Sequence, residues 1–485
     1  MTWLDLTYLA PEIVLAIGAC WLLLAPFVFR GNGHSLALWQ MLFLLLIAGG
    51  TLIWASSAVE QTPASAILRS MFVLDGFAIF FKLLFLGAVA AVVLLSSDFL
   101  REENHSPWEY YALLAFALCG MMFMVSGAHL ISIWIGLELL SVSSYILAGY
   151  YKEHAVSTEA AMKYFLLGSI SSAVMLYGMS LIFGVTGSLG LGDIAHVLQG
   201  ILQNDVLVVG IVMLAAGLCF KIAAVPFHVW TPDVYVGAPT PVTAFLSTAS
   251  KAAAFAVFAR IFYMALSQFR LDWAGVIAAV AALSMVVGNL AALTQDNVKR
   301  MLAWSSIGHA GYGLLGILAM SELGLVSLLV YLLVYVVATM GIWALVIMLR
   351  RGEYAGESIS DFAGLNARAP FWAFAMVVFL LSLGGIPPTA GFVGKYYLFL
   401  AAIGSGWGWL AIVAVLMSAV SMFYYLRLVV AMYLRDDPGR PIAANASLKL
   451  VAAACLLITL ALGLAPQPML TEVSRSLRTV VATLR

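Results

Sequence analysis

Apolar segments recur from one end of the sequence to the other, and their length restricts the fold more than any other feature. A helix needs about 20 predominantly apolar residues to cross the hydrocarbon core of a bilayer. We therefore predict an all-α integral membrane protein that forms a single polytopic membrane domain over residues 1–485. The predicted spans number fourteen: 10–29, 36–56, 74–96, 109–125, 128–151, 157–184, 206–226, 240–266, 272–293, 299–319, 323–350, 370–403, 408–434 and 447–465.

Composition supports this class and excludes others. The chain is 64% hydrophobic and 9% charged, whereas soluble proteins carry about 25% charged residues. Its 23 basic and 23 acidic side chains form no basic stripe, so a nucleic-acid partner is not expected. The four cysteines form no CxxC pair and no glycine fingerprint opens a helix after a strand. We therefore expect no metal, iron–sulfur or nucleotide cofactor in this chain.

Loop charges predict the orientation in the membrane. An even number of spans places both termini on one side, and Asp5 and Glu12 argue for a retained first helix instead of a cleaved signal peptide. Eleven basic residues follow odd-numbered spans and six lie on the opposite side, which predicts that both termini lie outside the cytoplasm. The eleven are Arg30, Arg101, Lys152, Lys299, Arg300, Arg350, Arg351, Arg368, Arg435, Arg440 and Lys449, and the six are Arg69, Arg260, Arg270, Arg475, Arg478 and Arg485.

Two predicted spans contain signals for a broken helix. The segment 370–403 is long for one crossing and contains "GGIPPTAGFVGK", and the segment ending near Pro226 continues into "HVWTP". Proline removes a backbone donor and clashes with the preceding turn. Broken helices at membrane depth occur only inside protein or beside a water-filled cavity. Such paired interruptions are typical of inverted repeats, which we predict here.

Charges inside the spans are the candidate functional residues. The basic ones are Lys82, Lys163, Lys221, Lys251, Lys395 and Arg427, and Glu138 is the one acid near the middle of a span. Lys82 and Arg427 are within reach of an interface, where long side chains extend to water. A central charge costs at least ~2.5–3.5 kcal/mol, and such residues mark ion pathways by default. Buried groups beside opposite charges can titrate and pass protons along a row.

Alternative interpretations remain for several of these residues. Lys163 and Lys395 could instead make structural contacts between helices. His228 follows a helix break and His309 lies mid-span among small residues, so either histidine could bridge the lysines as a proton relay or simply pack.

Four sequence motifs resemble those of the antiporter-like subunits of respiratory complex I. They are "FKIAAVPFHVWTPDVYVGAPTPVTAFLSTASK", "LGGIPPTAGFVGKYYLF", "DNVKRMLAWSSIGHAGY" and "IWIGLELLSVSSYIL". Lysine at position 395, the chain length and the absence of a long C-terminal lateral helix are similar to the subunit N type within that family. The resemblance covers essentially the whole chain, with an antiporter-like core at roughly 105–435 and extra helices at both ends.

The resemblance implies a proton-translocating subunit of NADH:quinone oxidoreductase, without a redox centre of its own. FMN and iron–sulfur clusters are expected in partner subunits, and the partners in the membrane arm are antiporter-like and small membrane subunits. Glu138, Lys163, Lys221, Lys251 and Lys395 match charged family positions. Glu138 and Lys221 would form the coupled pair that senses a neighbouring subunit, and Lys251 with His228 or His309 would be the connecting relay. Lys395 would exchange protons with the far side.

The same resemblance favours a bacterial chain in the inner membrane, because the animal mitochondrial form lacks the first three helices. Two other functions stay open: a subunit of a multisubunit cation/proton antiporter, and a passive assembly scaffold whose charges no longer function.

Overall fold

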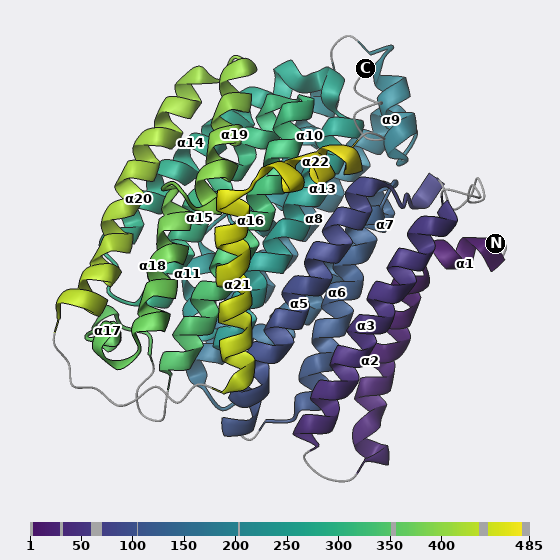
Figure 1. The fold of residues 1–485 in the computed structure, drawn as a ribbon. Helices are drawn as coiled ribbons and strands as arrows, with labels where there is room; N and C mark the ends of the chain where they lie inside the picture. The colour runs from purple at the N-terminus through teal and green to yellow at the C-terminus, as the bar shows by residue number, and fades with distance from the viewer. Residues whose placement is uncertain are drawn as a thin grey trace. The chain divides into compact units, whose positions relative to one another are not determined.

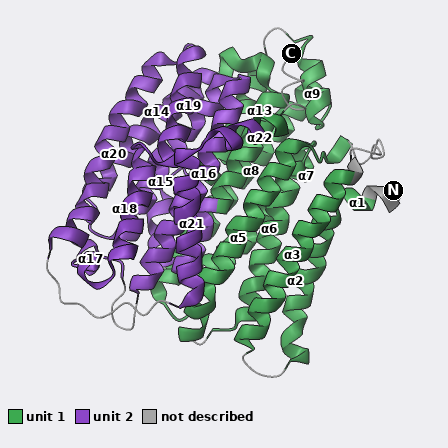
Figure 2. Ribbon diagram, viewed as in Figure 1, with its two compact units in different colours: residues 1–221, 249–273, 474–485 green, residues 222–248, 274–473 purple. Residues whose placement is uncertain are grey.

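Helices account for the secondary structure of the computed structural model (Figure 1), which describes residues 3–29, 33–59, 70–103, 105–201, 204–350, 356–435 and 445–477. In those ranges, β-structure is limited to isolated bridges such as Phe72 with Gly127. The chain divides into two units (Figure 2): residues 1–221, 249–273 and 474–485 form unit 1, and residues 222–248 and 274–473 form unit 2. Six residues of the predicted charge distribution lie outside the described residues: Arg30, Arg69, Arg351, Arg440, Arg478 and Arg485.

Unit 1 contains the N-terminal helices and the helix that begins at Lys251. Its helices α6 and α7 approach closely because two glycines face each other. A Cβ atom on Gly120 would lie 2.6 Å from the carbonyl oxygen of Gly136, and one on Gly136 would lie 2.8 Å from that of Gly120. Small residues allow this kind of contact between membrane helices. The helices are α1 (Trp3–Tyr8), α2 (Ala10–Val28), α3 (His34–Val59), α5 (Gly76–Glu102), α6 (Pro107–Ser126), α7 (Leu130–Ala148), α8 (Ala155–Thr186), α9 (Leu191–Leu198), α10 (Asp205–Ile222) and α13 (Lys251–Met264).

Unit 2 is built around α16 (Glu322–Leu349), which packs against α15, α18, α19 and α21 and is buried along most of its length. Helix α16 is hydrophobic on all sides, as expected for a helix surrounded by other helices. The remaining elements are α11 (Trp230–Gly237), α12 (Thr240–Phe245), α14 (Arg270–Ala292), α15 (Val298–Ala319), α17 (Leu365–Arg368), α18 (Pro370–Gly384), α19 (Ala390–Gly404), α20 (Gly408–Leu434), α21 (Ala446–Leu464) and α22 (Gln467–Ser476).

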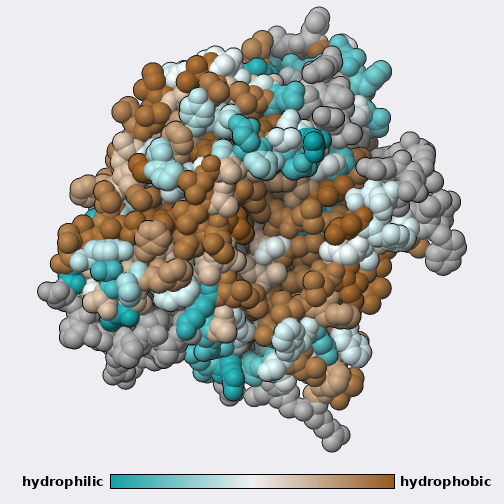
Figure 3. Space-filling view, in the orientation of Figure 1, coloured by the Kyte–Doolittle hydropathy of each residue, from teal (hydrophilic) through white to brown (hydrophobic). Residues whose placement is uncertain are grey.

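Each predicted span coincides with a helix or a broken pair of helices, which confirms the all-α membrane fold class. Twelve of the described helices are long and apolar enough to cross a bilayer. The other two predicted spans are α15, which carries buried polar residues, and the segment 370–403, which is divided into α18 and α19. Large apolar side chains are exposed on both units, including Phe27, Trp54 and Phe423 at 85%, 55% and 65%. Figure 3 shows such hydrophobic side chains gathered over the middle of the helices.

Both predicted helix breaks are confirmed. Helix α10 ends at Ile222, the chain turns through residues 223–229, and α11 begins at Trp230. Helix α18 ends at Gly384, and Gly385 takes a left-handed conformation with φ of 84°, which glycine adopts without strain. A third irregularity was not predicted: a π-helical turn over Leu246–Ser250 directly precedes α13.

Candidate functional site

In unit 1, Lys221 is buried near the end of α10, with 6% of its surface exposed. Its ammonium group lies 5.5 Å from the ring centre of Tyr145 and 5.4 Å from that of Tyr164. No hydrogen-bond acceptor in the described part of the chain reaches this ammonium. Two aromatic rings therefore lie close to the ammonium, and aromatic faces attract a cation when water is excluded.

Glu138 lies on α7 and is half-buried. The hydroxyl of Ser172 on α8 donates to its Oε1 atom, and the indole Nε1 of Trp134 donates to the Ser172 hydroxyl at 3.1 Å. Glu138 interacts electrostatically with Lys221, although the ion pairs of the described residues do not include one between them. The predicted pair therefore shares one unit without direct contact, so its coupling acts over a longer range.

Lys251 is the first residue of α13 and is 2% exposed. It follows the π-helical turn, and the most apolar stretch within Thr240–Met264 is buried throughout. Single π-helical turns occur frequently at functional sites. The π-helical turn inserts one additional residue into the helix directly before Lys251.

In unit 2, Lys395 on α19 is 4% exposed and reaches back to the break between α18 and α19. Its Nζ atom donates to the carbonyl oxygen of Gly384 at 3.1 Å and to the hydroxyl of Ser418 at 3.0 Å. The ammonium also lies 4.6 Å from the ring centre of Tyr312. Because Gly384 is the last residue of α18, Lys395 binds a carbonyl at the negative end of that half-helix.

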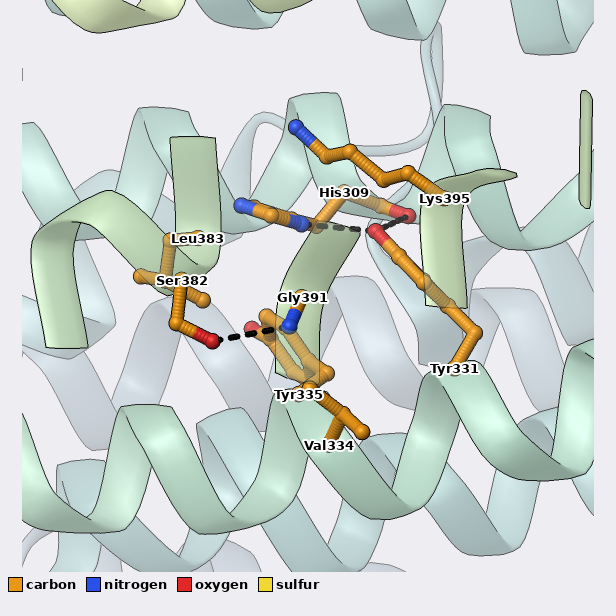
Figure 4. A pocket seen from close by; sticks show the side chains of 8 residues that line it. All are labelled: His309, Tyr331, Val334, Tyr335, Ser382, Leu383, Gly391 and Lys395. Atoms are coloured by element: carbon orange, nitrogen blue, oxygen red, sulfur yellow. Dashed lines mark hydrogen bonds between the residues drawn. The ribbon is translucent and has the colours of Figure 1, made fainter. Parts of the chain in front are cut away.

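His309 and Lys395 line one small cavity of about 10 Å³ (Figure 4), close to the minimum volume for one water molecule. The Nδ1 atom of His309 lies 2.6 Å from the Tyr331 hydroxyl, and Nε2 lies 3.2 Å from the Tyr425 hydroxyl. Both ring nitrogens of this buried histidine therefore face hydroxyl groups, which can donate or accept a proton. The residues lining the cavity are His309, Tyr331, Val334, Tyr335, Ser382, Leu383, Gly391 and Lys395.

The other two predicted site residues have different surroundings. His228 lies in the turn after α10 and is half-buried, with its ring 5.4 Å from that of Trp304. The side chain of Lys163 is 42% exposed on α8 and forms an ion pair of 2.7 Å with Glu159. Lys163 is therefore not among the buried lysines, and its part in proton transfer stays a prediction.

Two buried ion pairs in unit 1 were missed, and both correct the sequence interpretation. Lys82 was expected to reach an interface, but it is fully buried and lies 2.5 Å from the carboxylate of Glu12. Arg260 was assigned to a loop, but it lies within α13, is 2% exposed and donates to both carboxylate oxygens of Asp75 at 2.7 and 3.0 Å. The positions of Lys82 and Arg260 inside the predicted spans 74–96 and 240–266 indicate burial, but no sequence signal identifies their partners.

Lys299 was also assigned to a loop, and in the structure it is a buried residue in the first turn of α15. Its Nζ atom donates to the carbonyl oxygens of Val236 and Ala238 at 2.9 and 3.1 Å, and to Glu357 at 3.2 Å. These carbonyls belong to the end of α11. Lys299 thus satisfies backbone acceptors that the helix leaves unpaired.

Comparison with known proteins identifies the family of this chain. The family described as "NADH:quinone oxidoreductase/Mrp antiporter, TM" matches residues 127–421. NADH-quinone oxidoreductase subunit N 2 of Rhizobium meliloti (strain 1021) is 43% identical over 462 residues, which cover 94% of each chain. Subunit N of Parvibaculum lavamentivorans is 45% identical over 433 residues, covering 89% of this chain and 88% of that one.

Solved structures agree with these sequence matches. A chain of respiratory complex I from Thermus thermophilus with bound aureothin superposes with a TM-score of 0.81 and 35% identity, covering 95% of this chain and 98% of that one. A chain of the Mrp complex from Dietzia has a TM-score of 0.82 at 21% identity over the full length of both chains, a likeness of fold alone. The chain belongs to the NADH:quinone oxidoreductase/Mrp antiporter family, among relatives that are subunit N of NADH-quinone oxidoreductases.

Proposed function

We propose that the chain is the proton-translocating subunit N of the membrane arm of a bacterial NADH:quinone oxidoreductase. The observation that carries the proposal is the burial of three lysines in apolar helices, Lys221, Lys251 and Lys395, with exposures of 6%, 2% and 4%. Lys221 and Lys251 lie in segments long enough to span a membrane, and Lys395 lies in the shorter apolar helix α19. Lysines at such depth mark ion pathways by default. The names of the relatives supply the reaction that would drive the protons, namely electron transfer from NADH to quinone.

The redox chemistry belongs, in this proposal, to other subunits that hold FMN and iron–sulfur clusters. This chain contributes groups that accept, hold and release protons. In unit 1, Glu138 biases the protonation of Lys221, and Lys251 is the next group in line. In unit 2, His309 with its two phenol partners passes the proton to Lys395, which exchanges it with the far side. His228 is the alternative connecting histidine.

The surface of α8 supports a protein neighbour in the membrane arm. Lys163 and Glu159 are exposed there as an ion pair, and the half-buried Glu138 lies beside the same helix through Ser172. Exposed charged side chains on a membrane helix suit contact with another membrane subunit better than contact with lipid tails. We accordingly propose a multi-pass protein of the inner membrane, a single membrane domain whose antiporter-like core covers roughly residues 105–435.

The second candidate is a subunit of a multisubunit cation/proton antiporter, because the matching family includes Mrp antiporters. Purification through a tag on this chain distinguishes the two. Co-purification of flavin and iron–sulfur subunits, identified by mass spectrometry, is the expected result. A complex consisting only of membrane subunits would favour the antiporter.

A substitution tests whether the chain translocates protons or only supports assembly. Lys221→Met removes the titrating group and keeps an apolar side chain of similar length, so we expect normal assembly with impaired proton pumping. Lys449→Met, at an exposed position near the start of α21, is the matched control and should pump normally. Full pumping by an assembled Lys221→Met complex would favour the scaffold.

A further inference from the structure

Helix α21 of unit 2 packs against three of the helices that line the Lys395 cavity, namely α16, α18 and α19. The proposed proton path assigns no role to α21, which follows the antiporter-like core predicted from the sequence. The end of α21 nevertheless contacts the break between α18 and α19, at the start of the helix that carries Lys395. A helix outside the proposed path therefore touches the segment on which Lys395 depends.

The contact is made at Gly463, the last residue but one of α21. A Cβ atom on Gly463 would lie 2.7 Å from the carbonyl carbon of Thr389 and 2.8 Å from the amide nitrogen of Ala390. It would lie closer still to the carbonyl oxygen of Pro388. Non-bonded carbon atoms are best separated by about 3.5 Å or more. Only glycine therefore allows α21 to approach the backbone of the break this closely.

Two more glycines bring other helices against the first turns of α19. Gly391 has no room for a Cβ atom beside the carbonyl group of Ser382 on α18, and its N–H donates to the Ser382 hydroxyl at 3.0 Å (Figure 4). A Cβ atom on Gly394 would lie 3.2 Å from the Cα atom of Tyr331 on α16. The backbones of α16, α18 and α21 thus all approach the beginning of α19, and Lys395 directly follows Gly394.

The hydrogen bond between Lys395 and Gly384 spans the same break. Gly384 ends α18, and Lys395 lies five residues after the start of α19, which is about 7 Å along the helix axis. The bond is 3.1 Å long, and a separation of about 3.6 Å no longer makes a hydrogen bond. A contact that determines where α19 begins therefore also determines whether this bond forms.

Building on the proposed function, we propose that Gly463 is a positioning residue for Lys395. It allows α21 to hold the start of α19 where the ammonium reaches the carbonyl oxygen of Gly384. A larger residue at position 463 has to displace the backbone of residues 388–390 by about 1 Å, because the added atom and that backbone cannot overlap. A displacement of this size is enough to break the hydrogen bond. Helix α21 thus supports the site of proton exchange.

The substitution Gly463→Ala tests this role, because it adds one methyl group at the contact and changes no charge. Deuterium exchange is measured on the purified complex without turnover, and proton pumping on the reconstituted complex, normalised to its subunit content. We expect severalfold faster exchange of the backbone amides at residues 389–392 and a severalfold loss of pumping. Gly404→Ala is the matched control, since the described residues leave open space within 4 Å of that methyl group at the other end of α19. It should match wild type in both measurements.

Two further variants separate positioning from general damage. In unit 1, a Cβ atom on Gly178 would lie 2.6 Å from the carbonyl oxygen of Gly210. Gly178→Ala should therefore lower thermal stability, but leave exchange at residues 389–392 as in wild type. Ser418→Ala removes the second acceptor of Lys395. Combined with Gly463→Ala, it should reduce pumping by more than the product of the two single effects, because both changes act on the same ammonium.

The proposal is overturned if Gly463→Ala leaves exchange at residues 389–392 unchanged, or accelerates it while pumping stays at the wild-type level. Equal acceleration in Gly178→Ala, or a Gly463→Ala/Ser418→Ala loss that equals the product of the single losses, would overturn it as well. These results are distinguishable from a failure of the proposed function, which full pumping by assembled Lys221→Met would reveal on its own.

Discussion

At the scale of single residues, the buried lysines differ in what holds them. Lys395 has two hydrogen-bond acceptors, whereas Lys221 lies beside two tyrosine rings and interacts with Glu138 at longer range. A group outside its immediate contacts, Glu138, therefore contributes to the electrostatic surroundings of Lys221 in addition to burial. A change of charge at Glu138 should be transmitted to Lys221 without any rearrangement of hydrogen bonds.

The first prediction concerns that dependence. Glu138→Gln keeps the shape of the side chain and the acceptor for Ser172, but loses the negative charge. The complex should assemble, with impaired proton pumping or quinone-linked turnover, and Glu138→Asp should have a milder effect. Pumping by reconstituted complex, normalised to its subunit content, is the measurement. Equal pumping by Glu138→Gln and wild type would make Glu138 a structural residue.

The second prediction concerns Lys251, which must lose its proton in every cycle if it is a relay. Arginine keeps its proton at any working pH, so Lys251→Arg should stop proton transfer although it preserves the charge. Lys251→Ala should stop it as well. Lys449→Arg provides a control for the same exchange at an exposed site. Wild-type pumping by a fully assembled Lys251→Arg complex would exclude the relay role.

At the scale of helices, much of the architecture could be predicted. Length and hydropathy identified every span, and the prolines identified both breaks, because these properties are local. The π-helical turn at Leu246–Ser250 could not be predicted, since its sequence also suits an ordinary α-helix. The pairing of Glu12 with Lys82 and of Asp75 with Arg260 could not be predicted either, because no local pattern connects positions so far apart in sequence.

The third prediction concerns the pair that joins α2 to α5. Breaking a buried ion pair leaves an uncompensated charge and costs about 3–5 kcal/mol, whereas removing both partners can be nearly neutral. Glu12→Gln or Lys82→Met alone should therefore lower the thermal stability of the purified complex, and the double variant should recover most of it. If the double variant instead loses as much thermal stability as the two single variants combined, the two side chains act independently.

At the scale of the whole molecule, the arrangement of helices does not determine the orientation in the membrane. The distribution of basic residues predicts it. The excess of eleven over six loop charges predicts that both termini lie outside the cytoplasm. Two of the residues counted as loop charges, Arg260 and Lys299, are buried within helices in the structure. Without those two the counts become ten and five, and the predicted orientation is unchanged.

The fourth prediction tests that orientation with reporter fusions. A periplasm-active reporter fused at Leu484, which lies outside the described residues, should be active, and a cytoplasm-active reporter there should be silent. A fusion after Lys152, in the loop between α7 and α8, should show the reverse. Activity of the cytoplasmic reporter at Leu484 would mean that either the number of spans or the orientation is wrong.

The contacts of Lys395 have a consequence for the energetics of proton release. A charged lysine has three N–H groups, and its neutral amine retains two, which equals the number of acceptors that Gly384 and Ser418 provide. Deprotonation can thus leave both hydrogen bonds intact and the end of the half-helix satisfied. The neutral amine therefore keeps the geometry of the protonated form, so the surroundings need little reorganisation between the two protonation states of Lys395.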